Sequence, residues 1–261
     1  MYRAIAFAVC VVAVSSASAQ DGYERILLPV GPIAVSGAYG SEWRTFALVS
    51  NLSDTPLNVR GAAEDCGLPI CGPPPPLPPK ASFQVARTAD CAGRGGFLYV
   101  ESGRIRDVAV SLRSRDYSRA LDTWGTAVPV VGPTGLFERR FGITDIPVAD
   151  DKRATLRLFD VGNSTPSLVR VRIYGVRVPL RQQDAVPDTL VAERSVTPTP
   201  PSAGQAPFCP GFAEVPLTGY SGFDFLRVEI DPERSEREYW GYISVIDNET
   251  QHVTVLSPAQ P

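Results

Sequence analysis

The chain contains one histidine, His252, which follows a polar turn near the C-terminus. No serine lies in the Gly-x-Ser-x-Gly elbow that exposes the nucleophile of many hydrolases. A serine triad needs a histidine that contacts both the nucleophilic serine and a carboxylate. The sequence therefore gives no support to a serine hydrolase.

Carboxylates offer a second kind of catalysis, because glycosidases place two Asp or Glu side chains on either side of the bond that breaks. Acidic residues are grouped at Glu64-Asp65, at Asp150-Asp151 and between Asp231 and Glu238. Acids grouped in turns are usually solvated surface charges. We therefore keep a carboxylate-dependent hydrolase only as a remote alternative to a non-enzymatic protein, and we assign no catalytic residue.

Metal binding has little support either. Asp145, Asp150 and Asp151 could help to hold a calcium ion, but this stretch lacks the alternating Asp or Asn residues and the Gly of a dedicated loop. A structural zinc site needs paired short spacings of cysteine and histidine, whereas Cys66 and Cys71 are five residues apart and no histidine lies near them. We expect no metal and no other cofactor.

The first residues have the pattern of a secretory signal peptide. Arg3 precedes an apolar run from Ala4 to Val14, and small residues at 17–19 precede Gln20. The apolar run is shorter than the roughly 20 residues that a membrane helix needs, and no later segment approaches that length. We therefore expect residues 1–19 to be removed, and the mature protein to be exported to the periplasm, the cell surface or the medium without a transmembrane anchor.

Four cysteines follow the predicted leader: Cys66, Cys71, Cys91 and Cys209. An even number of cysteines in an exported protein indicates disulfides, here two. Four cysteines allow three connectivities, and the sequence does not choose among them. If Cys66 pairs with Cys71, then Cys91 must pair with Cys209 and join the two halves of the chain rigidly.

The charge of the chain makes nucleic acid an unexpected partner. The 25 basic and 28 acidic residues give a formal net charge of −3, and no run of Lys or Arg is available to grip a phosphate backbone.

Three tryptophans are the candidate binding surface. Trp43, Trp124 and Trp240 each lie beside a charged or small residue at the edge of an apolar run, where an indole could stack on a sugar or on a partner side chain. The alternative is that these indoles fill the ends of β-sandwiches or the junction between domains, since a buried Trp is common in such cores.

Short runs rich in β-branched and aromatic residues, separated by Gly, Pro, Asn and Asp, are typical of an all-β protein. The alternation from Val169 to Tyr174 places three apolar side chains on one face and polar side chains on the other. No segment has a sustained helical period. The predicted strands are Ile26–Val30, Arg44–Ser50, Leu57–Ala62, Gly96–Glu101, Arg106–Arg113, Thr155–Asp160, Ser167–Val176, Phe223–Ile230 and Tyr239–Asp247.

Two proline-rich stretches, Gly61 to Ser82 and Pro179 to Pro216, are predicted to contain no strand, because proline cannot donate to a ladder. A faint repeat relates the two halves. Five residues recur at an offset of 110, a length that matches one sandwich domain: Thr45, Leu48, Thr55, Pro56 and Val59 match Thr155, Leu158, Thr165, Pro166 and Val169.

Several motifs lie along the mature chain: Leu28-Pro29-Val30, residues 40–45 (GSEWRT), Val49-Ser50-Asn51, residues 114–117 (SRDY), residues 124–130 (WGTAVPV) and residues 242–250 (YISVIDNET). These motifs resemble those of secreted bacterial proteins of unassigned function that consist of two immunoglobulin-like β-sandwich domains. The resemblance implies an opening strand, a join between modules and a closing strand, and it supplies no catalytic residue.

We therefore expect an all-β protein of two tandem immunoglobulin-like antiparallel sandwiches, one at 20–125 and one at 126–261 that carries a long proline-rich loop. The favoured function is a non-enzymatic binding or adhesion protein whose partner is a protein or glycan at the cell surface. The alternative is a structural accessory subunit or spacer of an envelope assembly, in which edge strands pair with neighbouring chains.

Overall fold

The computed structural model describes residues 22–31, 34–37, 40–61, 75–85, 91, 94–118, 124–162, 167–179, 181–202, 208–234 and 236–259. The described chain is all-β with antiparallel sheets, as the sequence predicts, and short 3-10 helices lie at Ile105–Asp107, Pro133–Gly135 and Gln182–Asp184. Within these ranges, no helix has the length and apolar character that a membrane span requires.

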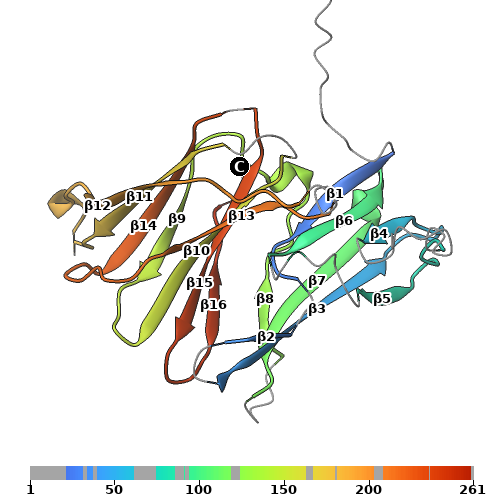
Figure 1. Ribbon diagram of the computed structural model, residues 1–261, viewed down its shortest axis with the longest axis horizontal. Helices are drawn as coiled ribbons and strands as arrows, with labels where there is room; N and C mark the ends of the chain where they lie inside the picture. Colours follow the sequence, from blue (N-terminus) through green and yellow to red (C-terminus); the bar gives the residue numbers. More distant parts are fainter. Residues whose placement is uncertain are drawn as a thin grey trace, which may run out of the picture.

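The first half of the chain forms two sheets that face each other (Figure 1). Sheet I has the order β1-β6-β4 and comprises β1 (Tyr23–Leu28), β6 (Gly96–Glu101) and β4 (Val59–Gly61). Sheet II has the order β2-β3-β7-β8, and β5 also pairs with β3. Its strands are β2 (Ala34–Ser36), β3 (Glu42–Asn51), β5 (Ser82–Val85), β7 (Val108–Asp116) and β8 (Thr126–Val128).

The second half forms two further sheets. Sheet III has the order β13-β10-β15-β16 and sheet IV the order β12-β11-β14-β9. The strands of sheet III are β10 (Lys152–Asp160), β13 (Gly211–Pro216), β15 (Tyr239–Asp247) and β16 (Val253–Leu256). Those of sheet IV are β9 (Phe141–Pro147), β11 (Val169–Val176), β12 (Thr189–Val196) and β14 (Phe225–Pro232).

Alternating side chains build a separate apolar core in each half. Between sheets I and II, Leu28 of β1 and Val49 of β3 belong to one cluster, and neither has measurable exposure. Between sheets III and IV, Leu156 of β10 and Val171 of β11 belong to another. Because successive residues of a strand point to opposite faces, each core uses every second residue of its strands.

A third apolar cluster joins the two halves. The face of sheet I that points away from its own core carries Leu27, Phe97 and Tyr99, and the outer face of sheet III carries Phe159 and Trp240. The ring centroids of Phe159 and Trp240 lie 6.1 Å apart. The parts of sheets I and III that carry these residues are therefore buried on both faces, and the halves are held together by aromatic packing.

Covalent and polar links reinforce this junction. Cys91 and Cys209 form a disulfide across 118 residues of sequence. Arg25 donates to the carbonyl of Val161 at 3.1 Å and lies over the ring of Phe97. The pairing of Cys91 with Cys209 is the one that joins the halves of the chain, whereas Cys66 and Cys71 lie outside the described residues.

A buried ion pair lies beside the junction. Arg237 Nη2 and Asp160 Oδ2 are 2.8 Å apart, and the two side chains are only 5% and 3% exposed. Burial raises the pKa of Asp160 to about 6, while the charge of Arg237 and the N–H of Gly162 oppose the shift. Removal of a carboxylate from water disfavours its ionised form, which is the physical cause of the raised value.

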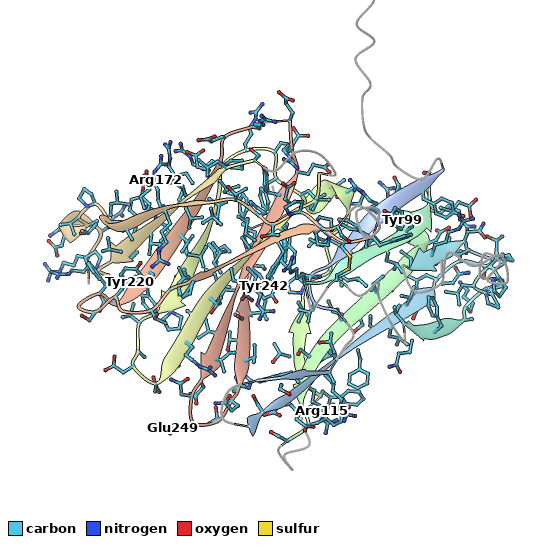
Figure 2. All side chains as sticks on the ribbon, in the orientation of Figure 1. Tyr99, Arg115, Arg172, Tyr220, Tyr242 and Glu249 are labelled. Atoms are coloured by element: carbon cyan, nitrogen blue, oxygen red, sulfur yellow. A yellow bond between two sulfur atoms is a disulfide. The ribbon has the colours of Figure 1, made fainter. Side chains whose placement is uncertain are left out.

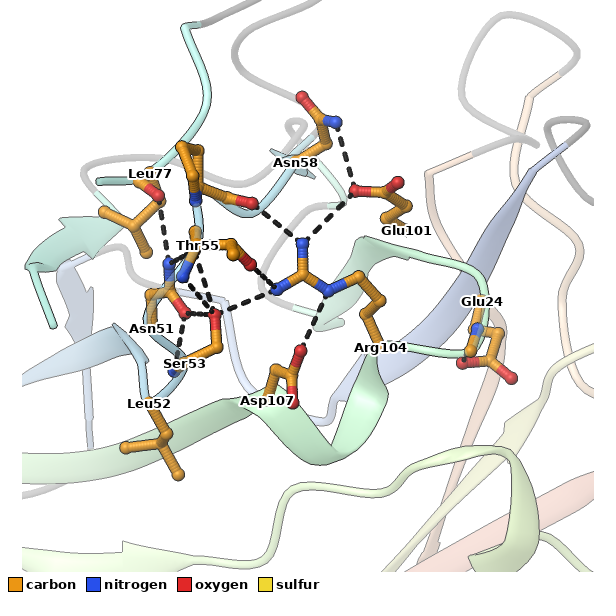
Figure 3. A network of polar contacts seen from close by, with 12 residues as sticks. Glu24, Asn51, Leu52, Ser53, Thr55, Asn58, Leu77, Glu101, Arg104 and Asp107 are labelled. Carbon is orange, nitrogen blue, oxygen red and sulfur yellow. Dashed lines mark hydrogen bonds and ion pairs between the residues drawn. The ribbon is translucent and has the colours of Figure 1, made fainter. Parts of the chain in front are cut away.

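A network of polar contacts connects two turns in the first half of the chain (Figure 3). Asn51 is 1% exposed, and its side-chain Nδ2 donates to the carbonyls of Thr55, Leu77 and Pro78 at 2.8–3.1 Å. Arg104 donates to Asp107 Oδ2 at 2.8 Å and to Thr55 Oγ1 at 2.8 Å. These contacts tie the turn after β3 to the turn before β7.

All nine predicted strands are confirmed, and the bounds of Gly96–Glu101 and Tyr239–Asp247 agree with β6 and β15. The prediction that Pro179 to Pro216 contains no strand is wrong, because β12 and β13 lie within it. The residues of β12 include no proline, and β13 has one only at its last position. Both are edge strands, where proline nearby is tolerated because one side needs no ladder partner.

The repeat is present in the pairing of the strands. In sheet II, β3 pairs with β5 and β7, and β7 with β8; in sheet III, β10 pairs with β13 and β15, and β15 with β16. The residues at the offset of 110 are not equivalent, however, since Leu48 is 46% exposed and Leu158 is buried in the core. A shift of one residue along a strand reverses its face. The two halves therefore repeat the order of strand pairing, whereas the matched residues do not all occupy equivalent positions.

Candidate binding cleft

A cleft of about 970 Å³ lies between the two halves, beside the aromatic junction. Its first wall is the inner face of sheet II. Ala47 and Val49 of β3 lie in the core of the first half, while the alternation continues along the same face to Trp43 and Thr45, which line the cleft. Ser114 and Val128 belong to the same face as Trp43 and Thr45, and Ala34 and Ser36 of the edge strand β2 also line the cleft.

The second wall is the outer face of sheet III, where β10, β13 and β15 turn their polar and aromatic positions away from the core. Arg157 lies between the core residues Leu156 and Leu158, and so points to the opposite face. Figure 2 shows Tyr242 on this sheet, in the region between the two halves. The residues of this wall include Arg157, Phe212, Glu214, Tyr242, Ser244 and Ile246.

The indole of Trp43 is fixed in position. Its Nε1–H donates to Ser41 Oγ at 3.0 Å. A Cβ atom added to Gly37 would lie 2.7 Å from Trp43 Nε1, so the absence of a side chain there allows the backbone to approach the indole. Trp43 is therefore a pre-positioned aromatic surface of the first wall, because two neighbouring residues restrict its movement.

Arg157, Glu214 and Tyr242 form a polar group on the second wall. Arg157 Nε lies 3.3 Å from Glu214 Oε1, and Arg157 Nη1 donates to the hydroxyl of Tyr242 at 3.4 Å. Burial raises the pKa of Tyr242, and the charge of Arg157 opposes the shift. The phenol therefore stays neutral at physiological pH, and the guanidinium is held in place by both partners.

The described lining combines polar, aromatic and aliphatic residues. Ser36, Thr45, Ser114, Thr199 and Ser244 line the cleft together with aromatic and aliphatic residues. Among the described lining residues the only carboxylate is that of Glu214, and it is paired with Arg157. A glycosidase-like pair of carboxylates is thus not part of this lining.

The three candidate tryptophans lie in different environments. Trp43 lines the cleft. Trp240 is 4% exposed within the apolar cluster that joins the two halves of the chain. Trp124 is 88% exposed and is not among the residues that line the cleft. The tertiary structure thus brings only Trp43 to the candidate site.

The other candidate groups do not converge on a site within the described residues. No group of three or more His, Cys, Asp or Glu side chains in that part of the chain could hold a metal ion. Asp231 forms ion pairs with Arg140 and Arg172 on sheet IV, at 3.1 and 3.2 Å. Glu64 and Asp65 lie outside the described residues.

Sequence reasoning missed the second wall. Arg157 and Phe159 occupy outward positions of a strand whose inner positions are apolar, and Trp240, Tyr242 and Ser244 do the same in β15. Aromatic side chains on both faces of neighbouring strands were a usable signal, because they indicate a sheet that is covered on both sides.

Comparison with known proteins gives no match: no protein-family model matches the chain, and neither does a curated protein or a solved structure.

Proposed function

We propose that this chain is an exported, non-enzymatic binding protein made of two tandem immunoglobulin-like β-sandwich domains, and that the cleft between them holds its ligand. The leader-like pattern of residues 1–19 supports export. The disulfide between Cys91 and Cys209 supports an oxidising compartment such as the periplasm or the exterior. Four sheets in two facing pairs, with repeated strand pairing, support the two-domain arrangement.

The observation that carries the proposal is the lining of the cleft. Ligand sites combine apolar and aromatic surface with a few placed polar groups, and they occur preferentially between domains. The cleft has this composition, with Trp43 on one wall and the Arg157–Glu214 pair on the other. Both groups are held by neighbouring side chains, so a ligand would not have to order them.

Self-assembly through an edge strand is the second candidate function. β12 is an edge of sheet IV, and exposed apolar side chains lie on it and near it: Leu190, Val186 and Val178 are 50%, 62% and 58% exposed. Two features oppose pairing with another chain. The register shifts between Ile173 and Tyr174 of the adjacent strand, and β12 carries charged residues, both of which protect edges.

The test is a pull-down with oxidised mature protein against envelope and culture-medium fractions, with retained proteins and glycans identified by mass spectrometry. Trp43→Ala is expected to lose the partner, whereas Trp124→Ala, which changes an exposed indole outside the cleft, is expected to retain it. Retention by Trp43→Ala together with loss in Trp124→Ala would move the contact away from the cleft. If only the protein itself is retained, and sedimentation shows oligomers that grow with concentration, the self-assembly function replaces the proposal.

A further inference from the structure

We propose that the cleft binds a short neutral oligosaccharide, an inference that rests on the proposed binding function. The cleft volume of about 970 Å³ lies at the upper end of the roughly 300–1,000 Å³ typical of small-ligand sites, so it can enclose several sugar rings. Four features of the walls favour a saccharide: the pairing of the backbone, the fixed indole, the polar groups and the balance of charge.

The strands that carry Trp43, Arg157 and Tyr242 are paired on both sides, whereas the edge strands β2 and β13 lie at the margins of their sheets. β3 is paired with β7 on one side and with β2 and β5 on the other, and β10 and β15 also have partners on both sides. A peptide that binds as an added strand needs unpaired N–H and C=O groups along an exposed edge. The strands that carry Trp43, Arg157 and Tyr242 offer no such edge, so these strands contact a ligand through their side chains.

The fixed indole of Trp43 suits the face of a sugar ring. A pyranose has an apolar face of C–H groups, whose partial positive charge is attracted to the negative face of an aromatic ring. Phe212, which lines the opposite wall, is also held in place, with its ring centroid 5.3 Å from that of Phe159. Aromatic surface is thus present on both walls of the cleft.

The polar groups suit the hydroxyls of a sugar, each of which can donate and accept a hydrogen bond. The Arg157 guanidinium donates, the Glu214 carboxylate accepts, and the two lie 3.3 Å apart. Thr45, Ser114 and Ser244 add hydroxyls that can do either.

The charge of the lining favours a neutral ligand over a polyanion. Among the described residues that line the cleft, the charged ones are Arg94, Arg157 and Glu214, and the last two neutralise each other. A polyanionic chain would place many negative charges against a lining whose described residues carry one net positive charge, whereas a neutral saccharide meets no such mismatch.

The experiment is a calorimetric titration of the oxidised mature protein with purified hexamers of β-1,4-glucose, α-1,4-glucose, β-1,4-N-acetylglucosamine, β-1,4-mannose and β-1,4-xylose. At least one is expected to bind and to change tryptophan emission. Trp43→Ala should weaken that binding about tenfold or more, while Trp43→Phe, which keeps a ring, should retain most of the affinity but lose the emission change. Arg157→Met should also weaken binding, and Trp124→Ala should not.

Lack of binding by all five hexamers, or binding that Trp43→Ala and Arg157→Met leave unchanged, would overturn the saccharide inference. Its failure differs from failure of the proposed function. A Trp43-dependent protein or peptide partner in the pull-down would leave the binding function standing with another ligand class. The wild-type titration decides the matter even if a variant does not fold, and urea denaturation of each variant identifies that case.

Discussion

Replacement of both Cys91 and Cys209 by alanine tests how the two halves are held together. The disulfide spans 118 residues, and the loss of chain entropy that such a loop imposes on the unfolded state corresponds to about 5 kcal/mol. Disulfides are commonly measured to raise the free energy of unfolding by about 2–4 kcal/mol, because unfolded chains retain some structure and the bond can strain the native state. We therefore expect the free energy of unfolding to fall by about 2–5 kcal/mol. Alanine is preferred to serine because Cys209 is 2% exposed, and burial of a serine hydroxyl without a hydrogen bond would destabilise the folded state further.

The assay is urea unfolding followed by tryptophan fluorescence. Trp240, which is 4% exposed in the junction, reports separation of the halves, whereas Trp124, which is 88% exposed, is expected to change little. A reductant should destabilise the wild-type protein by at least as much as the double substitution does. The double variant isolates this one bond, because it leaves any other disulfide intact. Equal urea midpoints for the oxidised wild-type protein and the variant would refute the reasoning.

Three further substitutions probe the junction and the first half. Phe159→Ala removes a ring with no measurable exposure, and we expect a loss of about 3–5 kcal/mol in urea unfolding. Asp160 has a pKa raised to about 6 in the folded protein, so protonation of this carboxyl favours the folded state. Its stabilising contribution is complete below pH 3.8 and is lost as the pH rises through about 6. The free energy of unfolding, measured at a series of pH values, should show this decline in the wild type and not in Asp160→Asn. Asn51→Ala removes donors to three carbonyls and should cost on the order of 3 kcal/mol, measured by thermal unfolding. A cost below about 0.5 kcal/mol would show that water replaces these hydrogen bonds.

The strands were predictable where the local pattern was strong. Gly96–Glu101 and Tyr239–Asp247 have the predicted bounds because long apolar or β-branched runs have few alternatives to a buried strand. β12 was missed because prolines on both sides suggested a loop, and only its position at the edge of sheet IV makes the segment a strand. Edge position is a property of the assembled sheet, and no local pattern specifies it.

The candidate site was predicted only in part. The sequence singled out Trp43, Trp124 and Trp240 as one class of residue, and the structure gives them three environments: a cleft wall, the solvent and a buried junction. All three lie in similar local contexts, with a charged or small neighbour at the edge of an apolar run. Burial depends on what lies opposite the strand, which local sequence does not contain.

The sequence by itself determined that the chain forms strands, which residues of each strand share a face, and that the cysteines can pair. The tertiary structure decided that Cys91 bonds Cys209, that sheets I and III meet through Phe97 and Phe159, and that Trp43 and Arg157 line the same cleft. Alternation along a strand is a local consequence of backbone geometry, and so it can be followed residue by residue. Which two faces meet depends on contacts between residues far apart in the chain, whose free energy is gained only when whole sheets come together.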